Sequence, residues 1–246
     1  MSKLIIAGIG PGNPDNMTIG VDNALRAADV ILGYGVYVDL IKDRFPDKEF
    51  FTTPMTKEKE RCLMGLELAA EGKNAVLICS GDSGIYGMAA LVYELRGETD
   101  TPEIEVLPGI TAACSGGALL GAPLTHDFAV ISLSDRLTDW EVIASRLDAA
   151  AKADFSIVLY NPASKGRPDH LRRACDILLR SLPEDRICGI AHAVGRDGES
   201  TRILSLRELR DAEADMFCTV FVGNSMSRQI GDKLITPRGY HGIHQE

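Results

Sequence analysis

The feature that most constrains this chain is the regular alternation of short apolar runs with longer amphipathic stretches. Runs rich in β-branched residues, typical of buried strands, cover 3–8, 29–33, 49–52, 74–80 and 104–107. Apolar residues recur every three or four positions, as on one face of a helix, over 19–27, 57–71 and 85–95. Strands that alternate with helices predict βαβ units around a largely parallel sheet.

The alternation resumes after a stretch of small residues. Residues 110–124 are rich in Ala, Gly, Ser and Thr, which predicts a closely packed helix that ends before Pro123. Further strands are predicted at 128–133, 155–160, 186–194, 202–204 and 217–222, with helices at 140–151 and 169–182. We therefore predict an α/β protein of two α/β domains, 1–122 and 123–246, with a cleft between them.

The charge balance excludes several function classes. The 246 residues include 26 Lys and Arg against 35 Asp and Glu, a net charge of −9, which argues against broad binding of nucleic acid or anionic membranes. No apolar run approaches the ~18 residues that span a bilayer. The chain passes from Lys3 into a strand with no signal-peptide pattern. We expect a cytoplasmic protein with no nucleic-acid or membrane partner.

Cysteine and histidine spacing gives no metal signature. The six cysteines form no Cys-x-x-Cys pair, and most lie in apolar stretches, so we interpret them as small core residues in a reducing compartment. His241 and His244 lie near the chain end with no obvious third ligand. We expect no metal.

The glycine-rich loop Gly8–Gly12 directly follows the first strand. It fails as a dinucleotide fingerprint, because Asn13 stands where the third glycine is needed and the second strand ends in Gly33-Tyr34 rather than in a ribose-binding acid. A ligand-binding loop and a purely structural turn both remain open for these glycines.

Two more glycine-bearing loops follow strands, at 80–87 and 107–112. The first is not a hydrolase elbow, because Ile85 occupies the position of the last glycine. Asp82 suits a ligand with hydroxyl or ammonium groups, although it could instead cap the helix that follows. Ligands of α/β sheets bind at the carboxyl ends of strands, so three such loops together predict a binding site.

Polar or basic loops follow strands in the second half as well, at 132–136, 160–168, 222–224 and 235–240. Each loop alone is compatible with a solvated surface. Together they form a cationic set on an acidic protein, which indicates an anionic ligand.

Read together, these motifs resemble the tetrapyrrole (corrin and porphyrin) methyltransferases, a family of two-domain α/β enzymes that use S-adenosylmethionine. The matching segments run in order along the chain: Gly8–Gly12, Gly81-Asp82, Pro108–Ala112, Tyr160–Pro162 and Val222–Asn224. The segments at 33–38, 132–135, 140–143, 161–168 and 235–240 are similar to those of the ring-contracting member. One departure is Ser83, where many members have proline.

The resemblance implies S-adenosylmethionine as cofactor, S-adenosylhomocysteine as bound product, a homodimer, and a tetrapyrrole held between the domains. Together with our interpretation of the glycine loops, it gives these cofactor-binding residues: Gly10, Pro11, Gly81, Asp82, Ile85, Thr111, Ala112, Asn161 and Gly195.

Ring contraction, which the resemblance also implies, requires proton movement. We assign that work to His192 and Asp135, with Tyr34, Ser134 and Lys165 as orienting groups, although His192 lies in an apolar strand and could be a core histidine. Corrin intermediates carry acetate and propionate arms, so the substrate would be a polyanion. The basic residues expected to bind those arms are Lys165, Arg167 and Arg238.

Other classes of function remain open from sequence alone. A nicotinamide oxidoreductase would need the ribose-binding acid that the second strand lacks. A non-catalytic tetrapyrrole carrier would bind pigment without methyl transfer. Sibling enzymes that methylate C11, C20 or C2 would differ only in their product.

Overall fold

The computed structural model describes residues 3–240, so the predicted His241 and His244 tail lies outside the described residues. By internal contacts the chain divides into two compact units, Met1–Ala112 and Ala113–Glu246. The sequence-based boundary followed residue 122, whereas the contacts group the helix of small residues with the second unit. Each unit is described by itself below.

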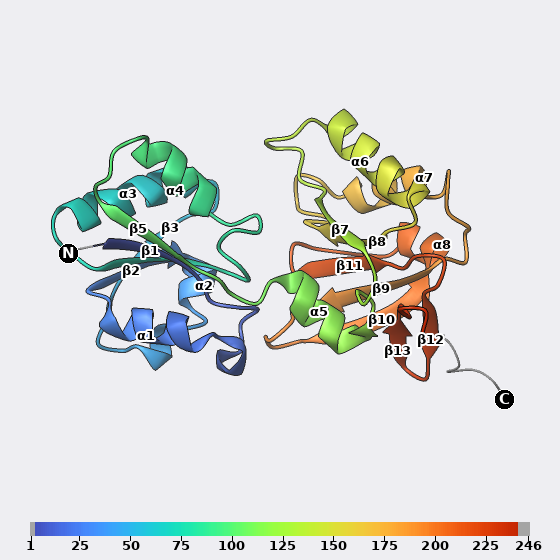
Figure 1. The fold of residues 1–246 in the computed structure, drawn as a ribbon, viewed down its shortest axis with the longest axis horizontal. Coiled ribbons are helices and arrows are strands. Elements are labelled where there is room, and N and C mark those ends of the chain that lie inside the picture. Colours follow the sequence, from blue (N-terminus) through green and yellow to red (C-terminus); the bar gives the residue numbers. More distant parts are fainter. Residues whose placement is uncertain (1–2, 241–246) are drawn as a thin grey trace. The chain divides into compact units, whose positions relative to one another are not determined.

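The first unit is built on a parallel five-stranded sheet (Figure 1) with the strand order β3-β2-β4-β1-β5. Its strands are β1 (Lys3–Gly8), β2 (Val30–Tyr34), β3 (Glu49–Thr53), β4 (Ala75–Cys79) and β5 (Glu103–Leu107). Every residue of β4 is buried, as expected for a strand that packs on both faces. Because all five strands run parallel, their carboxyl ends share one edge.

Helices cover both faces of this sheet. On one face are α1 (Ile19–Ala27) and α2 (Gly35–Val38), and on the other are α3 (Glu58–Ala70) and α4 (Ala89–Arg96). The two core clusters follow the strand alternation, since Leu4 and Ile6 pack with α3 and α4. Ile5 and Ala7 pack with α1 and α2. Two short 3₁₀ turns, Pro14–Asn16 and Lys42–Arg44, complete the unit.

The second unit contains a mixed five-stranded sheet with the order β10-β9-β11-β8-β7. Its strands are β7 (Phe128–Ser132), β8 (Ser156–Tyr160), β9 (Ile187–His192), β10 (Ser200–Ser205) and β11 (Cys218–Val222). Only β7 and β8 pair in parallel, and the other pairings are antiparallel. The carboxyl ends of β7, β8 and β9 therefore share an edge with the start of β11.

The helices of the second unit are α5 (Ala112–Leu120), α6 (Trp140–Lys152), α7 (His170–Leu178) and α8 (Leu206–Arg210). The main core cluster joins α6, α7 and α8 to one face of the sheet. A small second sheet has the order β12-β13-β6, where β12 is Arg228–Ile230, β13 is Lys233–Ile235 and β6 is Gly121–Ala122. A smaller core cluster joins α5 to the other face of the five-stranded sheet and includes Leu234 of β13.

The predicted α/β class is confirmed, and each predicted strand and helix has a counterpart. The largest differences are at two helix ends: α4 starts at Ala89 rather than at residue 85, and α7 ends at Leu178 rather than at 182. Five short elements were not predicted, namely α2, α8, β6, β12 and β13. They have two to five residues each, which is too few to show a period in sequence.

The cysteines are all unpaired, and five are buried. Burial raises the pKa of Cys62 and Cys175 to about 12, so these thiols stay protonated and serve as core residues. Cys114 is exposed on α5, and the prediction that the cysteines are core residues does not hold there. Among residues 3–240, no helix combines the length and apolarity needed to cross a membrane.

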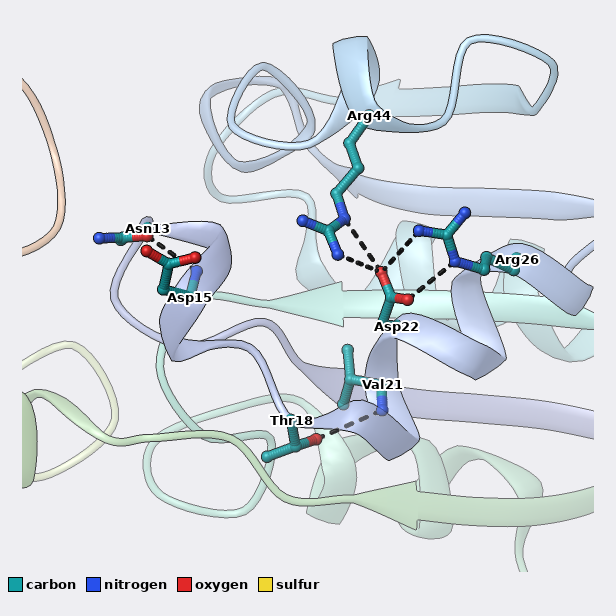
Figure 2. A network of polar contacts seen from close by, with 7 residues as sticks. All are labelled: Asn13, Asp15, Thr18, Val21, Asp22, Arg26 and Arg44. Carbon is teal, nitrogen blue, oxygen red and sulfur yellow. Dashed lines mark hydrogen bonds and ion pairs between the residues drawn. The ribbon is translucent and has the colours of Figure 1, made fainter.

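A polar network fixes α1 to the segment that follows α2 (Figure 2). Thr18 accepts a hydrogen bond from the Val21 amide and so caps α1. The Asp22 carboxylate receives Arg26 Nε at 2.8 Å and Arg44 Nη2 at 2.9 Å. Both guanidinium groups also lie over the Phe45 ring. The network thus joins two segments that the sheet does not connect directly.

The Asp22 network predicts a pH-dependent contribution to stability. Hydrogen bonding to Arg26, then to Arg44, lowers the pKa of the Asp22 carboxyl in the folded protein. This contribution is therefore present above the unfolded-state pKa, about 4, and is lost as the pH falls through the lower folded-state value. We expect Asp22→Asn to reduce the free energy of unfolding by ~0.5–1 kcal/mol at pH 7. Urea unfolding at several pH values measures this.

The matched control is Asp15→Asn, because Asp15 is exposed and its carboxylate is outside the network. The control should leave the free energy of unfolding nearly unchanged. If the free energies of unfolding of wild type and Asp22→Asn differed by the same amount from pH 7 to pH 3, the Asp22 carboxylate would not be the source of the pH dependence.

Candidate functional site

Three glycine-bearing loops meet at the carboxyl edge of the first sheet. They follow β4, β1 and β5, which are neighbours in the sheet. A Cβ added to Gly8 would lie 2.7 Å from the Gly109 nitrogen, and one added to Gly109 would lie 2.1 Å from the Gly81 carbonyl oxygen. Backbone packs directly on backbone here, so a side chain at either position would separate the loops.

Gly10 and Gly81 form a pair of backbone hydrogen bonds. The Gly10 amide donates to the Gly81 carbonyl at 3.0 Å, and the Gly81 amide donates to the Gly10 carbonyl at 2.7 Å. Both residues have positive φ, +77° and +68°, a region that side-chain-bearing residues rarely adopt. The two loops are therefore locked together by glycine geometry.

Asp82 holds the same junction through its side chain. Its Oδ1 accepts bonds from the amides of Gly84 at 2.8 Å and Ile85 at 3.0 Å, and its Oδ2 accepts from the Gly109 amide at 2.9 Å. A carboxylate offers about four lone-pair positions, so Asp82 retains capacity for one further donor. The capping interpretation of Asp82 is wrong, because α4 starts only at Ala89. Asp82 instead joins two loops, and its role in ligand binding stays a prediction.

These contacts change the expected character of the site. The amides of Gly10, Gly81, Ile85 and Gly109 bond within the protein. These four amides are therefore not available to a ligand, whereas the Asp82 carboxylate keeps one acceptor position. That position suits a ligand that carries positive charge and a hydrogen-bond donor.

Ser83, at the position where the family resemblance leads one to expect proline, supports the same junction. It is fully buried, and its Oγ donates to the Leu107 carbonyl at 2.9 Å. The hydroxyl thus ties the loop after β4 to the end of β5. A hydrogen bond supplies here the rigidity that a proline ring would supply.

The other predicted residues of the first unit lie on the same edge. Thr111 is buried, and its Cα lies 3.6 Å from a Cβ placed on Gly81. Ala112 follows at the end of the unit, and Pro11 lies between the glycines of the first loop. Tyr34 ends β2, with its ring edge-on to Tyr37 at 5.3 Å.

The second unit has a polar cluster beyond the ends of β7 and β8. Asn161, held at φ +54°, donates from Nδ2 to Ser132 Oγ at 2.9 Å. Ser132 Oγ also accepts from the Ser134 amide at 3.2 Å. A single hydroxyl therefore links the two predicted loops.

Arg167 extends this cluster. Its Nη1 donates to Ser134 Oγ at 2.5 Å and lies 3.9 Å from Asp135 Oδ1, and its Nε donates to Ser164 Oγ at 3.2 Å. The other Asp135 oxygen lies 3.0 Å from His170 Nε2. Chiefly through His170, and also through Arg167, the pKa of the Asp135 carboxyl is lowered. Asp135 is thus held as a carboxylate.

His192 lies on the same edge of the second sheet but outside this cluster. Its Nε2 is 3.3 Å from Asp215 Oδ2, and its side chain is 36% exposed, so it is not a core histidine. Two strands separate β9 from β7, a distance of about 14 Å at ~4.8 Å per strand. His192 and Asp135, predicted together, are not neighbours.

One group of three potential metal ligands occurs in the described part of the chain: His192, Asp215 and Cys218, with ligand atoms within 4.8 Å of one another. Asp215 accepts bonds from the Phe217 amide and the Cys218 thiol. Burial raises the pKa of Cys218 to about 11. These hydrogen bonds explain why the three side chains lie close together: they stabilise the turn that leads into β11.

The remaining predicted residues are dispersed in the second unit. Gly195 has φ +69°, and its amide donates to Glu199 at 2.7 Å, so this amide is engaged within its own loop. Lys165 and Arg238 are exposed. The structure thus gathers Ser134, Asp135 and Arg167 tightly. Lys165 lies in the Ser164–Arg167 turn beside them with an exposed side chain, and Gly195 and Arg238 lie in other loops.

Sequence reasoning missed His170 and Trp140 as members of the cluster. His170 is the first residue of α7 and is only 6% exposed. Its ring meets Trp140, the first residue of α6, edge-on at 5.0 Å. The available signal was position: both residues start helices that directly follow the predicted loops.

The family follows from comparison with known proteins. A model of the tetrapyrrole (corrin/porphyrin) methylases matches residues 3–210, which is most of the chain. The chain therefore belongs to the tetrapyrrole methylase family, and it is a methyltransferase. The family predicted from the sequence motifs is confirmed.

Several relatives extend this result. The probable cobalt-factor III C(17)-methyltransferase of Salmonella typhimurium is 44% identical over 96% of this chain and 99% of its own length. The cobalt-factor III methyltransferase of Priestia megaterium is 41% identical over 97% of this chain, which spans only 45% of that longer protein.

Solved structures show the same fold. The crystal structure of the methyltransferase CobJ is 38% identical, with a TM-score of 0.89 over 96% of this chain and all of that chain. A uroporphyrin-III C-methyltransferase of Thermus thermophilus, complexed with S-adenyl homocysteine, has a TM-score of 0.67 over 90% of this chain and 92% of its own. At 20% identity, that second likeness shows the fold alone.

The glycine junction yields a prediction about cofactor binding. We expect Gly81→Val to abolish binding of S-adenosylmethionine, because valine does not tolerate φ +68° at a position that ties three loops together. Asp82→Asn should weaken binding by ~1–3 kcal/mol and lower the melting temperature, since an amide nitrogen would face backbone amides. Calorimetry and thermal melts measure both effects.

Gly20→Val is the matched control, because a Cβ at Gly20 on α1 has open space around it. It should bind the cofactor as wild type does. Near-wild-type affinity in both Gly81→Val and Asp82→Asn would remove the junction from the binding site.

Proposed function

We propose that this protein uses S-adenosylmethionine to methylate C17 of cobalt-factor III or precorrin-3B, with contraction of the macrocycle, in cobalamin biosynthesis. The observation that carries the proposal is the 44% identity to the Salmonella relative across nearly the full length of both chains. The CobJ likeness, at a TM-score of 0.89, supports the same assignment. We further propose that the enzyme is a homodimer.

The Asp82 carboxylate at the edge of the first sheet fits S-adenosylmethionine. Its sulfonium and ammonium groups are positive, and the Asp82 carboxylate keeps capacity for one more donor. Gly10, Pro11, Gly81, Ile85, Thr111 and Ala112 lie on this edge and would line the cofactor. From the second unit, Asn161 and Gly195 are proposed as further contacts.

When bound, the cofactor supplies an electrophilic methyl group. The reduced macrocycle supplies the electron-rich carbon, so methyl transfer needs no strong base on the protein. The chain's own task in this step is to align the two reactants and exclude water. A junction of backbone locked to backbone suits that task, because it has few side-chain rotamers to reorganise.

Ring contraction adds proton movement. Asp135 is held as a carboxylate, so it serves as an acceptor for a substrate N–H or O–H rather than as a proton donor. Ser134 bonds to Arg167 beside it. His192, paired with Asp215 on the same sheet edge, is the proposed proton carrier, and Tyr34 is an orienting group from the first unit.

In the decisive experiment, the purified protein is incubated with methyl-labelled S-adenosylmethionine and one substrate. Cobalt-factor III is the substrate in one reaction and precorrin-3B in the other. NMR then locates the new methyl group and tests for the contracted ring. Label at C17 in one substrate supports the proposal and shows whether cobalt is required. Label at C11, C20 or C2 would assign a sibling activity, and binding without any transfer would indicate a carrier.

Arg167 provides a prediction about substrate binding. The protein carries a net charge of −9, so a polyanionic substrate requires a local cationic patch. We propose Arg167, Lys165 and Arg238 as that patch. We expect Arg167→Ala to raise the substrate KM at least several-fold, which corresponds to a loss of ~1–3 kcal/mol in the free energy of substrate binding. The effect should become smaller as the salt concentration increases. Steady-state kinetics at two ionic strengths measure it.

Arg146→Ala is the charge-matched control, because Arg146 is exposed on α6, away from the strand ends. It should leave KM unchanged. Arg238→Ala should raise KM with less effect on stability than Arg167→Ala, since Arg238 is exposed whereas Arg167 is bonded to two serines. Wild-type KM in both variants at low salt would overturn the patch.

His192 provides a prediction about proton movement. If it carries protons during contraction, His192→Gln should leave methyl transfer largely intact and slow formation of the contracted product. Single-turnover product analysis separates the two steps. His126→Gln, at another partly exposed histidine of the same unit, is the control. Parallel loss of both steps together with thermal stability would reduce His192 to a structural residue.

A further inference from the structure

His170 is fixed in place by its packing. It is the first residue of α7, and 8% of its side chain is exposed. Its ring stands edge-on to Trp140, with 5.0 Å between centroids and an interplanar angle of 77°. The guanidinium of Arg173, one turn further along α7, covers the same indole at 3.9 Å. The histidine ring therefore has little freedom to turn.

The ring nitrogen Nε2 points into the polar cluster without a completed hydrogen bond. It lies 3.0 Å from Asp135 Oδ2, but within the described chain it has no partner in hydrogen-bond alignment. A buried polar atom left unsatisfied is costly and calls for an explanation. A small turn of the Asp135 carboxylate, which is 33% exposed, would complete the bond.

Asp135 is held just as incompletely on its other side. Its Oδ1 lies 3.9 Å from Arg167 Nη1, which already donates to Ser134 at 2.5 Å. The carboxylate therefore sits between two nitrogen donors and is fully bonded to neither. Such a group can change its orientation at low cost when a third donor arrives, while the fixed imidazole limits which orientations remain.

We propose that His170 is a positioning residue that holds the Asp135 carboxylate toward the substrate. In this arrangement Nε2–H donates to Oδ2, so Oδ1 presents its lone pairs to an N–H or O–H group of the bound tetrapyrrole. The inference rests on the proposed function, since it assigns Asp135 to the substrate side of that reaction. His170 itself touches no reacting atom and acts through Asp135 alone.

The test compares two replacements of His170, one that can donate a hydrogen bond to Asp135 and one that cannot. His170→Phe keeps a flat ring against Trp140 and loses the donor, whereas His170→Gln keeps an N–H near the position of Nε2. We expect the phenylalanine variant to melt close to wild type yet lose roughly tenfold or more in kcat, with the KM for S-adenosylmethionine unchanged. The glutamine variant should recover most of that loss. His126→Phe is the control.

A double-mutant cycle with Asp135→Asn tests whether His170 affects kcat through Asp135. If His170 acts through Asp135, replacing His170 in the Asp135→Asn background should change kcat little further. Equal losses in both backgrounds, or no recovery by glutamine, would overturn the proposal. Parallel falls in melting temperature and kcat would also overturn it, because they would reduce His170 to packing.

A measurement without substrate keeps this inference separate from the proposed function. Nitrogen-15 NMR of the His170 ring should show a protonated Nε2 whose chemical shift changes in Asp135→Asn. An unchanged shift would contradict the contact itself. If the wild-type protein methylates neither cobalt-factor III nor precorrin-3B, the proposed function fails, and the ring shift still decides whether His170 holds Asp135.

Discussion

The contact on which the rest of the first unit depends is backbone against backbone, where the loops after β1, β4 and β5 meet. Gly8 and Gly109 leave no room for a Cβ, and Asp82 bonds to amides of two loops. The parallel sheet makes this possible because it brings three carboxyl ends to one edge. The geometry of the main chain therefore determines the shape of the proposed cofactor site. The side chains packed elsewhere in the unit hold that main chain in place.

Most of the architecture could be predicted from the sequence because its buried segments are either unbroken apolar runs or have a helical period. β4 is a run of five buried residues, and α1 buries Val21 and Leu25, four positions apart. The start of α4 could not be predicted in the same way. Apolar residues from position 85 continue the helical period, but Asp82 takes up the Ile85 amide and Tyr86 has φ +55°. A side-chain-to-backbone hydrogen bond within the loop and the positive φ of Tyr86 decide that boundary, and helix propensity does not.

The candidate site shows a similar division. Gly81 and Asp82 were recognisable because glycine and carboxylate at a strand end have few other uses. His170 was not, because its one sequence signal, a place at the start of a helix after a predicted loop, does not distinguish it from a surface histidine. Its relation to Asp135 spans 35 positions in sequence and exists only after β7 and β8 pair in parallel. Contacts of that kind are created by the fold and have no signature in a single sequence.

The strand order also bears on how the protein is made. β1 is synthesised before the other four strands of its sheet, and it pairs with β4 and β5 and makes no pairing with β2. Its second edge stays without a partner until β5 ends at Leu107. At ~5–20 residues per second that wait lasts about 5–20 s. During translation a strongly apolar strand is thus exposed for seconds, and chaperones that cover nascent chains would have their longest access there.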